Sequence, residues 1–134
     1  MDLANLDFGK NPEITAVMNV IHPITGEEMY QDDGVTPVTV TLLGMESSIA
    51  KRITKARAQK QLNKRNQKVD LDEAREFTIS LQAKLITAAQ GFKENGQDLD
   101  LTDQATAVDV LTRYSWLREQ IDEFITDRAN FYKA

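Results

Sequence analysis

The sequence has no cysteine and only one histidine. Without cysteine, the chain has no disulfide, thiol nucleophile or thiolate metal site, which fits a reducing compartment. The histidine, His22, stands before Pro23 with no second histidine in the chain, so we assign it a turn or packing role rather than catalysis or metal binding. No phosphate-binding glycine loop, nucleophile motif or zinc spacing occurs. We therefore expect no enzymatic activity, no cofactor and no metal ion.

Long apolar segments are also missing. The mean hydropathy is negative, and the uncharged stretch at residues 35–45 contains Thr, Pro and Gly and is too short to cross a bilayer. The first residues are acidic where a secretory signal is basic, and no apolar segment follows them. These features predict a cytoplasmic protein with no membrane partner.

The composition that remains is that of an ordinary globular domain. The 134 residues, 41% hydrophobic and 28% charged, fit one domain. Residues 1–12 carry Asn, Gly, Lys and Pro without periodicity, so we expect a flexible N-terminal arm followed by a single domain over residues 13–134. The net charge of -5 disfavours nucleic acid as a general partner.

Two stretches of alternating apolar residues predict strands near the start of the domain. Residues 14–20 and 38–43 each alternate with a period of two. Between them, a glycine-containing turn signal lies on each side of Met29-Tyr30, which is a candidate for a short extra strand. We expect a small antiparallel hairpin or sheet over residues 13–44, covered by helices because it is too small to be stable alone.

A basic helix is expected next, over residues 47–68, with Ser47 or Ser48 as its cap. This stretch holds eight of the sixteen Lys and Arg residues but few apolar ones, so it would stand partly clear of the body. A solvated helix is favoured over a phosphate-contacting one, because no aromatic residue is interleaved. Residues 94–134 carry nine acids against four bases, so this arm could also dock by charge onto a neighbouring copy.

Helical periodicity dominates the rest of the domain, residues 70–134. Asp70 and Glu73 resemble a capping box. Apolar residues then recur at steps of three and four as far as Phe92, which predicts one helix that ends near Gly91 or at the Asn-Gly pair beyond it.

Two further helices are expected at the end of the chain. The first begins after a Thr102 cap, and the second begins at a sharp junction where Ser115 acts as the cap and runs to about Tyr132. Five of the nine aromatic residues lie between residues 114 and 132, enough apolar area to anchor a core or an interface. The expected fold is therefore α+β and mainly α, with a small N-terminal antiparallel sheet followed by about four helices, one of them the basic arm.

Three parts of the sequence resemble the tail assembly chaperones of long-tailed bacteriophages. HPITGEEM carries the His-Pro-x-Thr-Gly turn of that family, and a Leu-Leu-Gly and the basic helix follow it. The chain closes with YSWLREQIDEFITDRANF, which is similar to the family's Trp-Leu/Ile-Arg-Glu-Gln helix ending in Asp-Arg-x-x-Phe. The resemblance covers residues 13–134 and is most distinctive over residues 116–131. In one departure, AAQGFKENGQDLDL stands where similar proteins often carry a Trp-containing segment, with Phe92 as a possible substitute.

The resemblance implies a non-enzymatic chaperone that coats the tape-measure protein, recruits tail-tube subunits in the host cytoplasm and is absent from the finished particle. A homo-oligomer that binds amphipathic helices fits such a task. The candidate client-binding residues are Tyr114, Trp116, Leu117, Phe124, Phe131 and Tyr132. The candidate self-assembly contacts are Lys55, Arg57, Lys60 and Lys64. A place in the domain's own core is the alternative for the aromatic residues, and it is favoured for Trp116 and Phe124.

Two other functions stay open at this point. A structural virion protein, such as a minor tail or connector component, would be found in purified particles, where a chaperone is missing. A nucleic-acid-binding regulator would retain DNA or RNA with a steep dependence on salt concentration.

Overall fold

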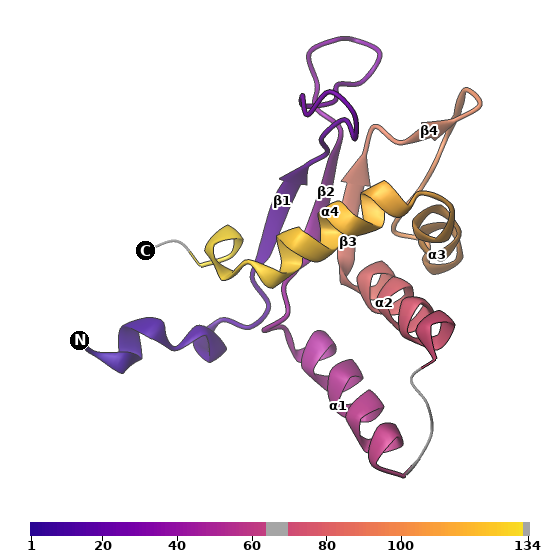
Figure 1. The fold of residues 1–134 in the computed structure, drawn as a ribbon. Coiled ribbons are helices and arrows are strands. Elements are labelled where there is room, and N and C mark those ends of the chain that lie inside the picture. The colour runs from indigo at the N-terminus through magenta and orange to yellow at the C-terminus, as the bar shows by residue number, and fades with distance from the viewer. Residues whose placement is uncertain (64–69, 133–134) are drawn as a thin grey trace.

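The computed structural model describes residues 1–63 and 70–132 and has a three-stranded antiparallel sheet with four α-helices (Figure 1). The α+β, mainly α prediction is confirmed. The elements, in chain order, are the 3-10 helices η1 (Leu3–Leu6) and η2 (Phe8–Lys10), the strands β1 (Thr15–Asn19) and β2 (Thr39–Leu43), the helices α1 (Ser48–Asn63) and α2 (Leu71–Leu85), the strands β3 (Ile86–Gln90), β4 (Lys93–Glu94) and β5 (Gln97–Asp98), the helices α3 (Gln104–Arg113) and α4 (Ser115–Thr126), and the 3-10 helix η3 (Arg128–Asn130).

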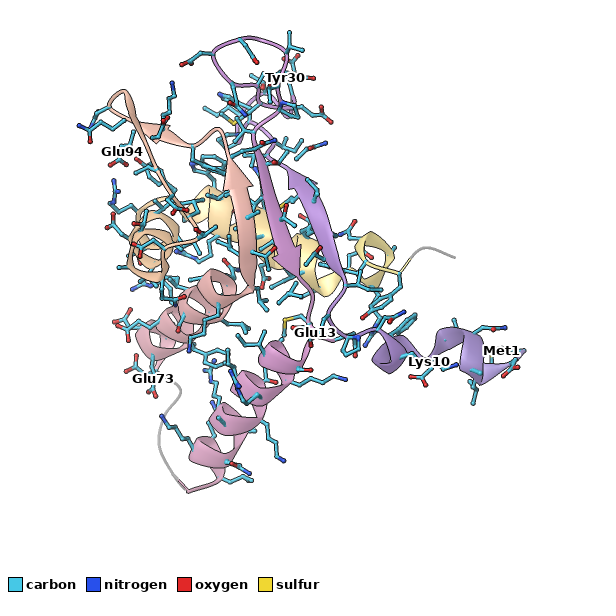
Figure 2. All side chains as sticks on the ribbon, turned by 180° about the vertical axis from the view of Figure 1, so that it is seen from behind. Met1, Lys10, Glu13, Tyr30, Glu73 and Glu94 are labelled. Carbon is cyan, nitrogen blue, oxygen red and sulfur yellow. The ribbon has the colours of Figure 1, made fainter. Side chains whose placement is uncertain are left out.

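The sheet has the strand order β1-β2-β3, so β2 lies in the middle. The predicted pairing of the first two strands is confirmed, with Val17 opposite Thr41 in an antiparallel register. Because successive side chains of a strand point to opposite faces of the sheet, Val40 and Leu42 lie on the same face, where both are fully buried. Helix α4 runs across that face (Figure 1), and the opposite face is the one turned to the viewer in Figure 2.

The third strand corrects the prediction of a single helix from residue 70 to Gly91. Helix α2 begins where predicted, with the Asp70 carboxylate accepting hydrogen bonds from the backbone N–H groups of the first turn, but it ends at Leu85. Strand β3 follows immediately and pairs with the second edge of β2. The apolar spacing of residues 86–90 is compatible with either a helix or a strand. The strand forms because β2 offers backbone hydrogen-bonding groups along its second edge. The sheet is thus completed from mid-chain rather than by an N-terminal segment.

The stretch after β3 was expected to be helix end and loop, and it forms a short hairpin of β4 and β5 instead. Asn95 and Gly96 connect the two strands with φ values of 52° and 79°, the left-handed pair that a tight two-residue hairpin turn requires. The Met29-Tyr30 segment forms no named strand. Tyr30 makes an isolated bridge with Pro37, and Met29 donates its backbone N–H to the carbonyl of Val20 and accepts from the N–H of Val38.

The helix boundaries near the C-terminus also differ from the prediction. Asp103, not Thr102, caps α3 by accepting a hydrogen bond from the N–H of Thr106. Ser115 is the first residue of α4 rather than its cap, and the capping position belongs to Tyr114, whose side chain makes no cap hydrogen bond. Helix α4 ends at Thr126 and η3 follows, because the Asp127 carboxylate starts a new turn by accepting from the N–H of Ala129.

The core lies between the sheet and helices α2, α3 and α4. Its largest fully buried side chains include Leu42, Leu85, Leu111, Leu117 and Ile121. Gln82 is also fully buried, and its side-chain Nε2 donates to the carbonyl of Arg118 at 3.1 Å, which ties α2 to α4. At the predicted turn residue, the ring Nδ1 of His22 accepts from the N–H groups of Ile24 and Thr25, so its turn role is confirmed.

The two segments predicted as arms both make contacts with the rest of the chain. Phe8 stacks on Tyr132 with ring centroids 4.8 Å apart, and the Tyr132 hydroxyl donates to the carbonyl of Asn11. Among the described side chains of helix α1, that of Ala50 is buried, and the Ser47 hydroxyl caps the helix by accepting from the Ala50 N–H. Most other side chains of α1 are exposed, as expected for a helix with few apolar residues.

Candidate protein-binding groove

A groove of about 570 Å³ opens where the β1–β2 connection, the β4–β5 hairpin and the α3–α4 junction meet. Its floor consists of the buried core residues Val20, Val38, Val110 and Leu117. Half-buried apolar side chains form its walls, so a bound apolar side chain would contact apolar groups on several sides. These wall residues are Met29, Phe92, Leu99, Tyr114 and Trp116. The size is within the range of roughly 300–1,000 Å³ that is usual for binding pockets.

Gly91 brings two walls of the groove together at the end of β3. Its φ of 90° turns the chain away from the sheet, a conformation that side-chain-bearing residues rarely adopt. A Cβ atom at this position would also stand 2.8 Å from the Cγ of Gln31 and 3.1 Å from a methyl group of Val38. The glycine therefore allows Phe92 and the hairpin to approach the loop before β2.

The rim of the groove is acidic. Asp32, Asp33 and Asp98 line it together with one cation, Lys93. The Lys93 ammonium lies 2.8 Å from Asp32 and 4.0 Å from Asp98, and its hydrogen bond to Asp32 raises the pKa of Lys93. Three carboxylates against one ammonium leave an excess of negative charge beside an apolar floor.

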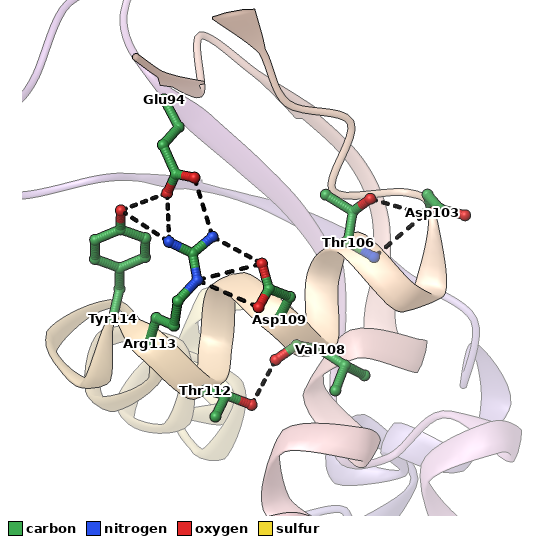
Figure 3. Close-up of polar contacts among 8 residues, drawn as sticks. All are labelled: Glu94, Asp103, Thr106, Val108, Asp109, Thr112, Arg113 and Tyr114. Atoms are coloured by element: carbon green, nitrogen blue, oxygen red, sulfur yellow. Dashed lines mark hydrogen bonds and ion pairs between the residues drawn. The ribbon is translucent and has the colours of Figure 1, made fainter.

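A charged cluster fixes the hairpin to the α3–α4 junction beside the groove (Figure 3). Both terminal nitrogens of Arg113 donate to the two carboxylate oxygens of Glu94, at 2.7 and 3.1 Å, and the same guanidinium donates to Asp109. The Tyr114 hydroxyl also donates to Glu94. Such bidentate contacts set geometry as well as energy, so Tyr114 is held at the groove wall by its ring and by its hydroxyl.

The pKa values of this cluster follow from the same contacts. The hydrogen bond from Arg113, and next that from Tyr114, lower the pKa of Glu94 below its ordinary value of 4.5. The hydrogen bond to Glu94 raises the pKa of Tyr114, with its partial desolvation adding to the shift. The hydrogen bonds to Asp109 and Glu94 raise the pKa of Arg113, which stays charged at every accessible pH.

Acidification should therefore loosen the hairpin. Because the folded-state pKa of Glu94 is lowered, its contribution to stability is fully present above its ordinary pKa of 4.5 and is lost as the pH falls through the lowered value. We expect Glu94→Gln to abolish this part of the acid response. Amide hydrogen exchange in β4 and β5, measured from pH 6 downwards at rates corrected for intrinsic pH dependence, would report it.

The matched control for this measurement is Glu119→Gln, which removes an exposed carboxylate from α4. This control should retain the wild-type acid response of the hairpin. Equal acid responses in wild type and Glu94→Gln would show that the Arg113 contact does not hold the hairpin in place.

The predicted client-binding residues fall into two groups rather than one site. Tyr114, Trp116 and Leu117 belong to the groove, the first two in its wall and Leu117 in its floor. Phe124, Phe131 and Tyr132 lie at the other end of α4. There Phe124 and Phe131 pack edge to face with centroids 5.5 Å apart.

The second group is largely occupied by contacts within the chain. Phe131 is 8% exposed, and its ring lies so near Gly44 that a Cβ there would be 3.2 Å from it. Tyr132 stacks on Phe8. Trp116 and Phe124, the two residues for which a core role was favoured, are both half-buried and pack against the core from its margin.

The predicted self-assembly residues differ in the contacts that they make in the structure. Lys55 and Lys60 are exposed on α1. Arg57 instead places its guanidinium over the ring of Phe77 at 4.2 Å, so it helps to join α1 to α2. Lys64 lies outside the described residues.

The sequence analysis did not assign three wall residues of the groove, Met29, Phe92 and Leu99, to the binding surface. Met29 lies in a loop, and the other two flank the β4–β5 hairpin, so no helical or strand pattern marks them as one surface. The Asn-Gly pair at residues 95–96 was the available signal, since it is typical of a hairpin turn and would have placed Phe92 and Leu99 side by side. The carbonyl of Phe92 indeed accepts from the N–H of Leu99 at 2.9 Å.

No helix in residues 1–63 and 70–132 is long and apolar enough to span a membrane. Within the same residues, no group of three or more His, Asp or Glu side chains is placed to hold a metal ion. No protein-family model, curated protein or solved structure matches the chain.

Proposed function

We propose that the chain is a non-enzymatic tail assembly chaperone of a long-tailed bacteriophage, and that its groove binds helical segments of the tape-measure protein. The observation that carries this proposal is the apolar groove with Trp116 and Tyr114 in its wall. Apolar grooves with aromatic walls bind amphipathic helices through a few side chains spaced one turn apart. The sequence resemblance in residues 116–131 supports the same assignment, because that segment carries the Trp of the groove.

The rim defines the chemistry of the preferred segment. Its apolar row enters the groove, and a Lys or Arg beside that row meets Asp32, Asp33 or Asp98. Exposed charge pairs of this kind contribute modestly to affinity and are screened by salt. The apolar contacts therefore supply most of the affinity, and the acidic rim selects among segments of similar hydrophobicity.

The remaining parts of the proposal concern assembly. Copies of the chaperone coat the tape-measure protein in the host cytoplasm, with Lys55 and Lys60 of α1 as exposed cationic contacts between copies. The coated complex recruits tail-tube subunits, and the chaperone leaves before the particle is finished. Mass spectrometry should accordingly not detect this chain in purified particles. A structural virion component would be detected there in stoichiometric amounts.

The experiment that tests the proposal uses fragments of the tape-measure protein from the same phage. Overlapping helical fragments are titrated against the full chain by isothermal calorimetry. We expect at least one fragment to bind with micromolar affinity, weakening only a few-fold between 50 and 300 mM salt, because apolar burial dominates. A fragment of identical composition with its apolar row scrambled is the control. Absence of binding by every fragment would contradict the proposal.

A further inference from the structure

The three strands of the main sheet carry no charged residue, although 28% of the chain is charged. Their sequences are TAVMN, TVTLL and ITAAQ. The strand residues on the face of the sheet opposite α4 are therefore uncharged. Val17, opposite Thr41 in the register and out of phase with the buried Val40 and Leu42, is one of them and is 59% exposed. Natural sheets usually protect their open edges with charges, prolines or bulges.

Strand β1 is an edge strand with unused backbone hydrogen-bonding groups. The N–H of Val20 donates to the carbonyl of Val38 at 3.0 Å. In an antiparallel ladder, bonded residues alternate, so Met18 and Ala16 also face β2. The N–H and C=O groups of Thr15, Val17 and Asn19 consequently point away from the sheet, and the described residues offer them no backbone partner.

The two edges of the sheet are not equivalent. The β2–β3 pairing shifts register between Thr41 and Leu42, so strand β3 is irregular. Irregularities of this kind discourage pairing at an edge. The β1–β2 pairing keeps one register from Thr15 to Asn19, and β1 contains no proline, glycine or charge. Strand β1 is thus the edge that remains suited to pairing from Thr15 to Asn19, whereas at the next outward residue, Ile21, the side chain of Gln120 in α4 already bonds the backbone N–H and C=O.

We propose that β1 pairs antiparallel with β1 of a second copy, about a two-fold axis at Val17. This register places Val17 opposite Val17 of the partner and Thr15 opposite Asn19, so that all outward backbone groups meet. Three residue pairs exchange two hydrogen bonds each, about six in total. The two three-stranded sheets become one continuous sheet.

We choose a second copy of the chain as the partner because the residues of β1 are compatible with those of β1 in another copy. Like charges directly opposite each other destabilise a strand pair, and in this register every opposed residue is uncharged. On one face Val17 meets its own copy with Thr–Asn pairs on either side, and on the other face Ala16 meets Met18. Two-fold pairing is isologous, so it closes at a dimer. It uses neither the groove nor the basic face of α1, and it is independent of the proposed chaperone function.

Hydrogen exchange of the wild-type protein tests the proposal without a variant. The amides of Thr15, Val17 and Asn19 should be protected at high protein concentration and should exchange rapidly on dilution, in step with dissociation followed by analytical ultracentrifugation. The amides of Ala16 and Met18 should stay protected at every concentration, because they bond to β2. Rapid exchange of the three outward amides at all concentrations would overturn the proposal. Protection that appears only on adding a tape-measure fragment would overturn the choice of partner.

A pair of variants gives a second, independent test. Val17→Pro removes an N–H that points to the edge, so it leaves the β1–β2 ladder intact. We expect it to raise the dimer dissociation constant by at least about tenfold. Val17→Thr keeps the N–H and the branched shape and should dimerise like wild type. Unchanged dimerisation of Val17→Pro would contradict edge pairing, and if that variant fails to fold, the exchange measurement on wild type still decides.

Discussion

Trp116→Ala is expected to weaken binding of a tape-measure fragment by about 30-fold or more, the equivalent of roughly 2 kcal/mol for a central aromatic contact. The indole is half-buried in the groove wall, so truncating it removes contact area from a guest without emptying the core. Calorimetric titration with the best-binding fragment measures the change.

The control for this variant is Ile24→Ala, which shortens an apolar side chain that is 88% exposed and lies away from the groove. It should bind like wild type. A thermal unfolding curve for each variant separates loss of binding from loss of fold. If a folded Trp116→Ala variant binds as tightly as wild type, the guest does not enter this groove.

The largest effect on stability is expected for Leu42→Ala. Leu42 is fully buried in the central strand, on the face that α4 covers (Figure 1). Large-to-small substitutions at such sites cost about 2–5 kcal/mol, because lost transfer free energy and a residual cavity add together. Urea unfolding at neutral pH, followed by circular dichroism, would give the difference in free energy.

Thr41→Ala is the matched control, one residue earlier in the same strand and directed to the opposite face. Thr41 is only half-buried, so we expect a loss below about 1 kcal/mol. Equal losses for the two variants would mean that α4 does not seal this face of the sheet.

Local patterns predicted most of the fold because they depend on neighbours in sequence. The period of two in residues 14–20 and 38–43 predicted β1 and β2, and the Asp70 start of α2 was visible in its capping residues. The residue at which α2 ends was not visible in the sequence. Residues 86–90 continue the spacing of three and four, and only the free side of β2, distant in sequence, makes them a strand. Tertiary hydrogen bonding overrode local preference there.

The candidate site was predictable only in part, for the same reason. Tyr114 and Trp116 stand out in the sequence as aromatic residues near a helix junction. Their partners Met29, Phe92 and Leu99 come from two loops that the fold brings to that junction. Conversely, Phe131 stands out equally in the sequence, and its burial depends on the space that Gly44 leaves for its ring.

The most direct test of the account uses the intrinsic fluorescence of Trp116, the only tryptophan in the chain. Tape-measure fragments without tryptophan are titrated into the protein while its emission is recorded. We expect a saturable blue shift with the same midpoint as the calorimetric binding curve, because the guest excludes water from the half-exposed indole. A fragment that binds by calorimetry and leaves the emission unchanged would place the binding site elsewhere and contradict the account.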